Sequence, residues 1–167
     1  MASTPFRYLY KFIYRLACLP KSVNTYVCVS SRTAPAAYDT ISAFLRDTQT
    51  KPADYDLILT GDLASIGKQI LIEAFRDDGV DIAPYYEDCG CMIYDRDAQD
   101  VHAGGSGCGC SASVLCGHIL NGMRMHRWDH ILFCATGALM SPLAIQQGES
   151  IPAICHLIEI ENGEDRA

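Results

Sequence analysis

The apolar positions of this chain alternate between helical and strand-like spacing. Residues 37–45 and 63–76 carry apolar side chains three and four positions apart, which predicts two helices. Between them, the short apolar run at 55–60 predicts a strand that Gly61 closes. The order helix, strand, helix is typical of an α/β domain.

The second half of the chain repeats this alternation. Residues 111–120 have helical spacing, and we expect Asn121-Gly122 to end that helix. Two runs predict strands, a buried one at 130–135 and a half-exposed, alternating one at 153–161.

Two segments are harder to assign. The stretch 80–100 reads mainly as connection, in which 92–94 is a candidate short strand. Residues 136–152 form a long connection, which is uncommon in a compact domain unless it has a function. We therefore expect a single α/β layer structure.

Residues 1–33 differ from the rest, because they contain no acidic residue. Arg7, Lys11 and Arg15 form one helical stripe among aromatic side chains. Two interpretations stay open: a short helix on an anionic membrane surface, or a loosely ordered basic and aromatic leader. The apolar run is too short and too charged to span a bilayer. Residues 162–167 form an acidic tail.

Charge and cysteine content narrow the functional classes. The net charge of −7 and the pI near 5.0 argue against nucleic-acid partners, because the average surface repels phosphate. The chain has nine cysteines but no convincing secretory signal, so we expect reduced thiols in the cytoplasm rather than secretion.

The glycine-rich segment 103–112 is the leading candidate for chemistry, since four of the six residues 104–109 are glycine. Glycine permits positive φ and close approach of a ligand to the main chain, and a helix follows directly. The loop predicts a site where backbone N–H groups hold a small anion. The alternative is tight packing of this backbone against a neighbouring strand.

Five motifs carry a resemblance to a known family. In chain order they are Thr60-Gly-Asp-Leu63, Glu87-Asp-Cys-Gly90, the segment 103–112, Ala135-Thr-Gly-Ala-Leu139 and Gln146-Gln-Gly-Glu-Ser-Ile-Pro152. Across about 34–161 they resemble the second half of the stage V sporulation protein AD family of spore-forming bacteria.

The resemblance implies a thiolase-like fold: one C-terminal half of a duplicated α/β architecture, with a mixed sheet packed by helices. It also implies binding of dipicolinic acid, or its calcium chelate, for uptake into the developing spore. The implied partners are other stage V sporulation membrane proteins at the spore inner membrane. Because the first half of the family is not present, we expect a truncated product that self-associates or pairs with a missing N-terminal half.

The resemblance also argues against catalysis. Gly61-Asp62 stands where a condensing enzyme has its histidine, and Gly105–Cys108 stands where its asparagine would lie. Acyl transfer needs a nucleophile, a base and an oxyanion site together. The open alternative is an acyltransferase half that a partner chain completes.

The expected site is a ligand-binding site without catalytic residues. Asp62 poses a difficulty, since two unit charges about 4 Å apart repel by on the order of 4 kcal/mol at an effective dielectric constant of ~20. Its carboxylate must bond elsewhere, be protonated or share a calcium ion; otherwise it caps the following helix. The expected ligand-binding residues are Gly61, Asp62, Gly104, Gly105, Ser106, Gly107, Cys108, Gly109 and Gly137.

A metal centre is a further alternative. Two close cysteine pairs, Cys89 with Cys91 and Cys108 with Cys110, offer four thiolates, and two histidines lie nearby in sequence. One intervening residue is fewer than structural zinc sites usually have, so the spacing favours small buried side chains instead.

Overall fold

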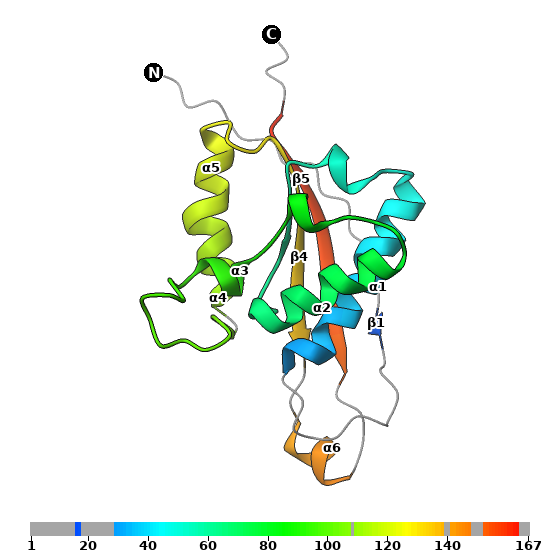
Figure 1. Ribbon diagram of the computed structural model, residues 1–167, viewed down its shortest axis with the longest axis vertical. Coiled ribbons are helices and arrows are strands. Elements are labelled where there is room, and N and C mark those ends of the chain that lie inside the picture. The colour runs from blue at the N-terminus through cyan, green and yellow to red at the C-terminus, as the bar shows by residue number, and fades with distance from the viewer. Residues whose placement is uncertain (1–15, 18–28, 108, 139–140, 148–151, 164–167) are drawn as a thin grey trace.

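The computed structural model describes residues 16–17, 29–107, 109–138, 141–147 and 152–163 (Figure 1). The predicted basic stripe at Arg7, Lys11 and Arg15 lies outside these residues, as does Cys108.

A mixed five-stranded sheet in the order β1-β5-β4-β2-β3 forms the centre of the fold. β2 pairs in parallel with β3 and β4, whereas β5 pairs antiparallel with β4 and β1. The strands are β1 (Leu16–Ala17), β2 (Leu57–Thr60), β3 (Tyr86–Asp88), β4 (His130–Ala138) and β5 (Ala153–Glu161).

Helices cover both faces of this sheet. The longer ones are α1 (Val29–Thr48) and α2 (Ala64–Asp77), and α4 (Cys110–Val114), the π-helical turn η3 (Leu115–Ile119) and α5 (Leu120–Arg124) follow one another without a break. The short ones are η1 (Pro52–Asp54), η2 (Ala83–Tyr85), α3 (Cys89–Met92) and α6 (Pro142–Gln146).

Figure 1 shows three layers, with α1 and α2 on one side of the strands and the run from α4 to α5 on the other. Each side has its own apolar core. Alternate residues of β2 divide between them: Ile58 packs with Phe44 of α1 and Leu71 of α2, whereas Leu59 packs with Met123 of α5. All four residues of β2 are buried, as expected for a central parallel strand. The predicted α/β class with a mixed sheet is confirmed.

Helix α1 begins earlier than the spacing predicts. The prediction started this helix after Pro35, because proline removes an intrahelical hydrogen bond. The structure instead includes Pro35 within α1, where Ala34 and Ala36 are buried against the core. Tertiary packing of small side chains outweighs the local preference of proline.

Two other predictions are wrong at the level of single elements. The candidate strand at 92–94 is the end of α3 and the following turn, because Asp88 caps α3 by accepting from the N–H of Gly90. The helix predicted to stop at Asn121-Gly122 continues to Arg124. Gly122 is there a packing residue, since a Cβ would lie 2.4 Å from the Trp128 ring.

The remaining predicted segments are close to the observed ones. The helix predicted at 63–76 is α2, the strand predicted at 153–161 is β5, and the strand predicted at 130–135 continues to Ala138 as β4. The long connection is therefore shorter than expected and contains α6.

Candidate functional site

The carboxyl ends of the three parallel strands meet at one edge of the sheet. Thr60, the last residue of β2, is in register with Asp88 of β3 and with Cys134 of β4. The next residues of the chain, Gly61-Asp62, therefore lie beside Thr136 of β4. Ligands of open α/β sheets bind at edges of this kind.

A buried carboxylate organises this edge. Oδ2 of Asp88 accepts from the Thr60 hydroxyl at 2.6 Å and from the N–H of Leu63 at 2.9 Å. Oδ1 accepts from the N–H groups of Ala64 at 2.7 Å and Gly90 at 2.9 Å. The four contacts join β2, β3 and the start of α2 to one side chain.

The environment of Asp88 has opposing effects on its acidity. Burial raises the pKa of this carboxyl, while its hydrogen bonds to Thr60 and to three backbone N–H groups oppose the shift. Ala64 has a φ of +55°, a left-handed conformation unusual for alanine, and its N–H is one of those donors. The first amides of α2 are thus bound by Asp88, and that of Ser65 by the Ala103 carbonyl.

Glycines let the loop before α4 pack directly on this edge. A Cβ on Gly104 would lie 2.4 Å from the Gly90 carbonyl oxygen, and a Cβ on Gly90 would lie 2.3 Å from that of Gly105. A Cβ on Gly105 would meet the Ile93 side chain at 2.4 Å. Side chains at these positions would push the loop before α4 away from α3 and the residue that follows it.

The Asp62 carboxylate connects β2, β4 and the glycine loop. Its Oδ1 accepts from the Thr136 hydroxyl at 2.9 Å, and its Oδ2 accepts from the Ser106 hydroxyl and from the Gly107 N–H, each at 3.1 Å. The Thr136 hydroxyl oxygen in turn accepts the Asp62 N–H at 3.1 Å. We call Asp62, Ser106, Gly107 and Thr136 the Asp62 cluster.

The other predicted site glycines have different surroundings. A Cβ on Gly61 would lie 2.9 Å from Oγ1 of Thr136 and 3.3 Å from Cβ of Ser111, so Gly61 permits the start of α4 to approach β4. Gly137 has ordinary van der Waals surroundings. Gly107, with a φ of +112°, and Gly109 face open space.

Three glycines of the loop direct their N–H groups to acceptors within the chain. The Gly104 N–H donates to the Val101 carbonyl at 2.9 Å, and the Gly105 N–H donates to the Gly90 carbonyl at 2.7 Å. The Gly107 N–H donates to Asp62. A polypeptide loop this close to the sheet edge satisfies its buried amides within the chain.

Asp62 does not cap α2, because the Asp88 carboxylate takes the first amides of that helix. Of the options left open for Asp62, hydrogen bonding elsewhere in the chain is the observed one. Asp88 and Thr136 are the residues that sequence reasoning missed. The signal for Asp88 was available, since an acidic residue two positions before Gly90 in a segment read as connection is a natural N-cap.

The thiols near this edge are poor nucleophiles. Burial raises the pKa of Cys89 far above the usual thiol value and that of Cys91 to about 11. Burial and the charge of Asp88 also raise the pKa of Cys110. A thiolate, not a thiol, attacks carbonyl carbon or binds metal, so these side chains are inert at neutral pH. Among the described residues, no group of three or more metal-ligating side chains is placed to hold an ion.

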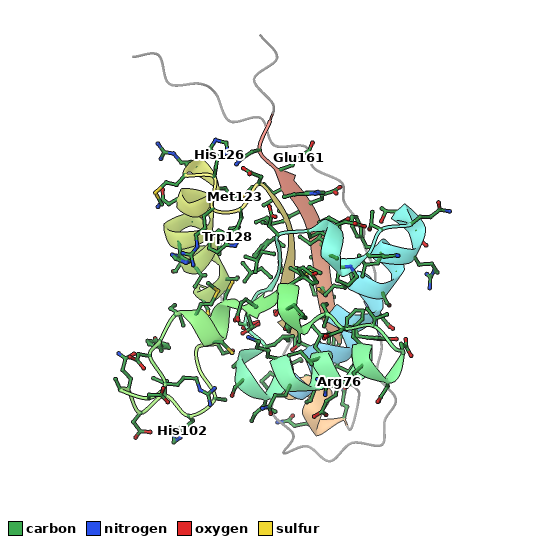
Figure 2. All side chains as sticks on the ribbon, turned by 45° about the horizontal axis from the view of Figure 1, so that its top comes forward. Arg76, His102, Met123, His126, Trp128 and Glu161 are labelled. Carbon is green, nitrogen blue, oxygen red and sulfur yellow. The ribbon has the colours of Figure 1, made fainter. Side chains whose placement is uncertain are left out.

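A shallow surface hollow of about 290 Å³ lies beside the site, between α3 and the run from α4 to η3. Its lining combines apolar side chains, including Ile93 and Val114, with Ser113 and His118. Ile93 is also the side chain that packs against Gly105. Figure 2 shows His102 on the loop between α3 and α4, on the part that projects away from the sheet.

These observations define an α/β domain whose clustered polar groups at the strand ends are hydroxyls, amides and carboxylates rather than activated thiols. The sequence profile of stage V sporulation protein AD (SpoVAD) matches residues 24–161. The chain belongs to this family, which confirms the resemblance carried by the five motifs. The match and helix α1 both begin before the domain boundary expected at residue 34.

One curated relative is stage V sporulation protein AD of Bacillus subtilis (strain 168), which is 45% identical over 133 residues. The alignment covers 80% of this chain and 39% of the B. subtilis protein, so the chain spans well under half the length of that relative. Among solved structures, the chain is similar to a complex titled a ketosynthase (ApeO) with its chain length factor (ApeC) from Xenorhabdus doucetiae. That similarity has a TM-score of 0.34 and 10% identity, and it covers 96% of this chain and 80% of the other.

Proposed function

We propose that the chain is a non-catalytic sporulation domain that binds dipicolinic acid, or its calcium chelate, for uptake into the developing spore. Membership of the stage V sporulation protein AD family supports the biological role. The single observation that carries the binding site is the set of three donors around Asp62: the hydroxyls of Thr136 and Ser106 and the amide of Gly107.

This donor set suits a carboxylate guest. A carboxylate oxygen accepts two hydrogen bonds readily, and bonds to a charged acceptor contribute about 1.5–3 kcal/mol each. Ser106 and Gly107 are exposed, so a small molecule can reach them from solvent. The proposed contacts are therefore fewer than the sequence predicted, because Gly104 and Gly105 hold the loop in place instead.

Calcium fits the same place. A dianion that approaches Asp62 is repelled, whereas its calcium chelate carries no net charge. Asp62 then supplies a hard oxygen ligand of the kind that calcium prefers. The proposal accordingly includes both the free acid and the chelate as guests.

Thiol chemistry favours binding over acyl transfer. The described cysteines at this edge have raised pKa values, which leaves them protonated at neutral pH. The family resemblance implies that Gly61 and Asp62 stand where a condensing enzyme has its histidine, and in this chain Asp62 connects the end of β2 to β4 and to the glycine loop.

The site of action that we propose is the surface of the spore inner membrane, with membrane proteins of stage V sporulation as partners. Among the helices in the described part of the chain, none has the length and apolar character needed to cross a bilayer. On this proposal, membrane partners carry dipicolinic acid across the membrane and this domain binds it at the membrane surface.

Calorimetric titration of the full chain with dipicolinate, with added calcium and with a chelator, tests the proposal. We expect one saturable site that discriminates against benzene-1,3-dicarboxylate, which has the same carboxylate spacing without the ring nitrogen. Thr136→Val removes one donor with little change of shape and should weaken binding by about tenfold or more. Thr50→Val removes a hydroxyl that bonds Tyr55 instead and serves as the matched control.

Absence of saturable heat under both conditions would refute the proposed function. Turnover of an acyl-coenzyme A thioester by the chain would also refute it, in favour of the acyltransferase alternative. If Thr136→Val and Thr50→Val weakened dipicolinate binding equally, the proposed binding site at β4 would be wrong.

A further inference from the structure

Both carboxylate oxygens of Asp62 accept hydrogen bonds from the donors that a bound anion would need. Oδ1 accepts from the Thr136 hydroxyl, and Oδ2 accepts from Ser106 and Gly107. Among the residues that the structure describes, the hydrogen-bond partners of Asp62 are hydroxyls and an amide, and none is a lysine or arginine. A carboxylate of the protein is thus already bound where the carboxylate of a guest would bind.

We propose that Asp62 is an internal competitor, whose carboxylate closes the glycine loop in the empty protein and must be displaced when an anionic guest binds. This inference rests on the proposed function and deepens it, because it assigns a gating role to one residue of the same site. Two carboxylates cannot share these donors at hydrogen-bond distance without strong repulsion. Binding of the free dianion and retention of the Asp62 contacts are therefore mutually exclusive.

The geometry allows this exchange. On one side the loop is fixed, since the backbone of Gly104 and Gly105 packs against Gly90. On the other side, Ser106 and Gly107 are exposed, and their hydroxyl and amide each donate one hydrogen bond to Asp62, just after β2. Gly107 has a φ of +112° and no atom within 4 Å of a Cβ position, so it can change conformation without steric conflict.

The contrast with Asp88 supports a gating role for Asp62. Asp88 is fully buried and accepts four donors, including three backbone amides from two segments, so its release would disrupt the sheet edge. Asp62 is only half-buried, and its carboxylate reaches solvent-exposed partners. The fold therefore has one carboxylate that holds the site together and one that is free to leave it.

The test compares wild-type chain, Asp62→Asn and Glu73→Gln by calorimetric titration with dipicolinate in the presence of a chelator. Asp62→Asn keeps the size of the side chain, removes its charge and weakens it as an acceptor, so we expect at least tenfold tighter binding. Glu73→Gln removes the same charge from the exposed side of α2, and its affinity should stay within about twofold of wild type.

A second measurement needs no ligand. Asp62→Ala removes the acceptor, so the Gly107 amide should exchange with deuterium at least tenfold faster than in wild type, while the amides of β2 and β4 keep their protection. Unchanged exchange at Gly107 would show that Asp62 does not close the loop and would overturn the inference.

The binding outcomes separate this inference from the proposed function. Wild type and Asp62→Asn with the same affinity, or a weaker Asp62→Asn, would overturn the competitor role and leave dipicolinate binding established. No saturable heat from either protein in the presence of the chelator would overturn the inference, and the proposed function would fall with it only if heat were also absent with added calcium.

Discussion

Two carboxylates at the ends of neighbouring strands, Asp62 just after β2 and Asp88 at the end of β3, differ in burial and in their hydrogen-bond donors. Asp88 is completely buried and accepts from one hydroxyl and three backbone amides, while Asp62 lies half-buried among hydroxyls and an exposed amide. Burial of an unpaired donor costs about 1–3 kcal/mol, so the number of donors that a residue satisfies predicts the effect of its removal. Stability and binding are thereby assigned to different side chains.

Removal of the Asp88 carboxylate should strongly destabilise the fold. Asp88→Ala leaves three backbone amides without their acceptor and the Thr60 hydroxyl with Tyr86 as its remaining partner, and we expect a loss of about 3–5 kcal/mol in the free energy of unfolding by urea. Asp56→Ala is the control, because the exposed Asp56 also accepts two backbone amides and should cost about 1 kcal/mol. Equal losses for the two variants would contradict the organising role of Asp88.

The raised pKa of Asp88 also predicts a pH dependence. The folded protein holds this proton more tightly than the unfolded chain, so the contribution of Asp88 to stability falls as the pH rises from the ordinary value of 3.8 through the higher folded-state pKa. The difference in free energy of unfolding between wild type and Asp88→Asn should decrease across that interval and level off above it. A difference that increases with pH would contradict this assignment.

A glycine with positive φ gives a test at the loop. Gly107→Ala forces a side chain into a left-handed conformation, which costs roughly 1 kcal/mol and moves the Gly107 N–H away from the position where it would donate to a guest. We expect dipicolinate binding to weaken about fivefold or more while the helical circular dichroism is retained. Gly109→Ala is the control. Gly109 also faces open space, but its φ of −93° suits alanine, so this variant should bind dipicolinate as wild type does.

At the scale of elements, the spacing of apolar residues predicts the helices and strands that are specified by their own sequence. The helix α2 and the strands β2, β4 and β5 follow from their own sequence. The start of α1 and the end of α5 do not, because Pro35 and Gly122 are tolerated only through packing against the core and Trp128. The glycine content marks the loop before α4 as special, but its attachment through Gly105 depends on Gly90, which is distant in sequence.

The two glycines of the last helical run should respond in opposite directions to alanine. Gly122→Ala places a Cβ 2.4 Å from the Trp128 ring, and we expect a loss of about 1–3 kcal/mol from overpacking despite the better helix propensity of alanine. Gly117→Ala meets open space within the π-helical turn and should stabilise by about 0.5–1 kcal/mol. Urea unfolding measures both, and a neutral Gly122→Ala would show that Trp128 moves aside freely.

At the scale of the whole molecule, the chain corresponds to 39% of its B. subtilis relative. Several large apolar side chains are exposed, among them Ile66 on α2 and Met125 after α5. We expect the isolated chain to self-associate, because apolar surface favours burial against a second copy. Sedimentation velocity over a range of concentrations measures this, and a strictly monomeric chain at the highest concentration would contradict it.

The most direct test of the binding site is amide-resolved NMR of the full chain during titration with dipicolinate. The account predicts saturable shifts centred on Asp62, Ser106, Gly107 and Thr136, with little change at the opposite ends of the strands. Shifts confined to the surface hollow around Ser113 and His118, or no shifts at all, would contradict the claim that the donors around Asp62 hold the guest.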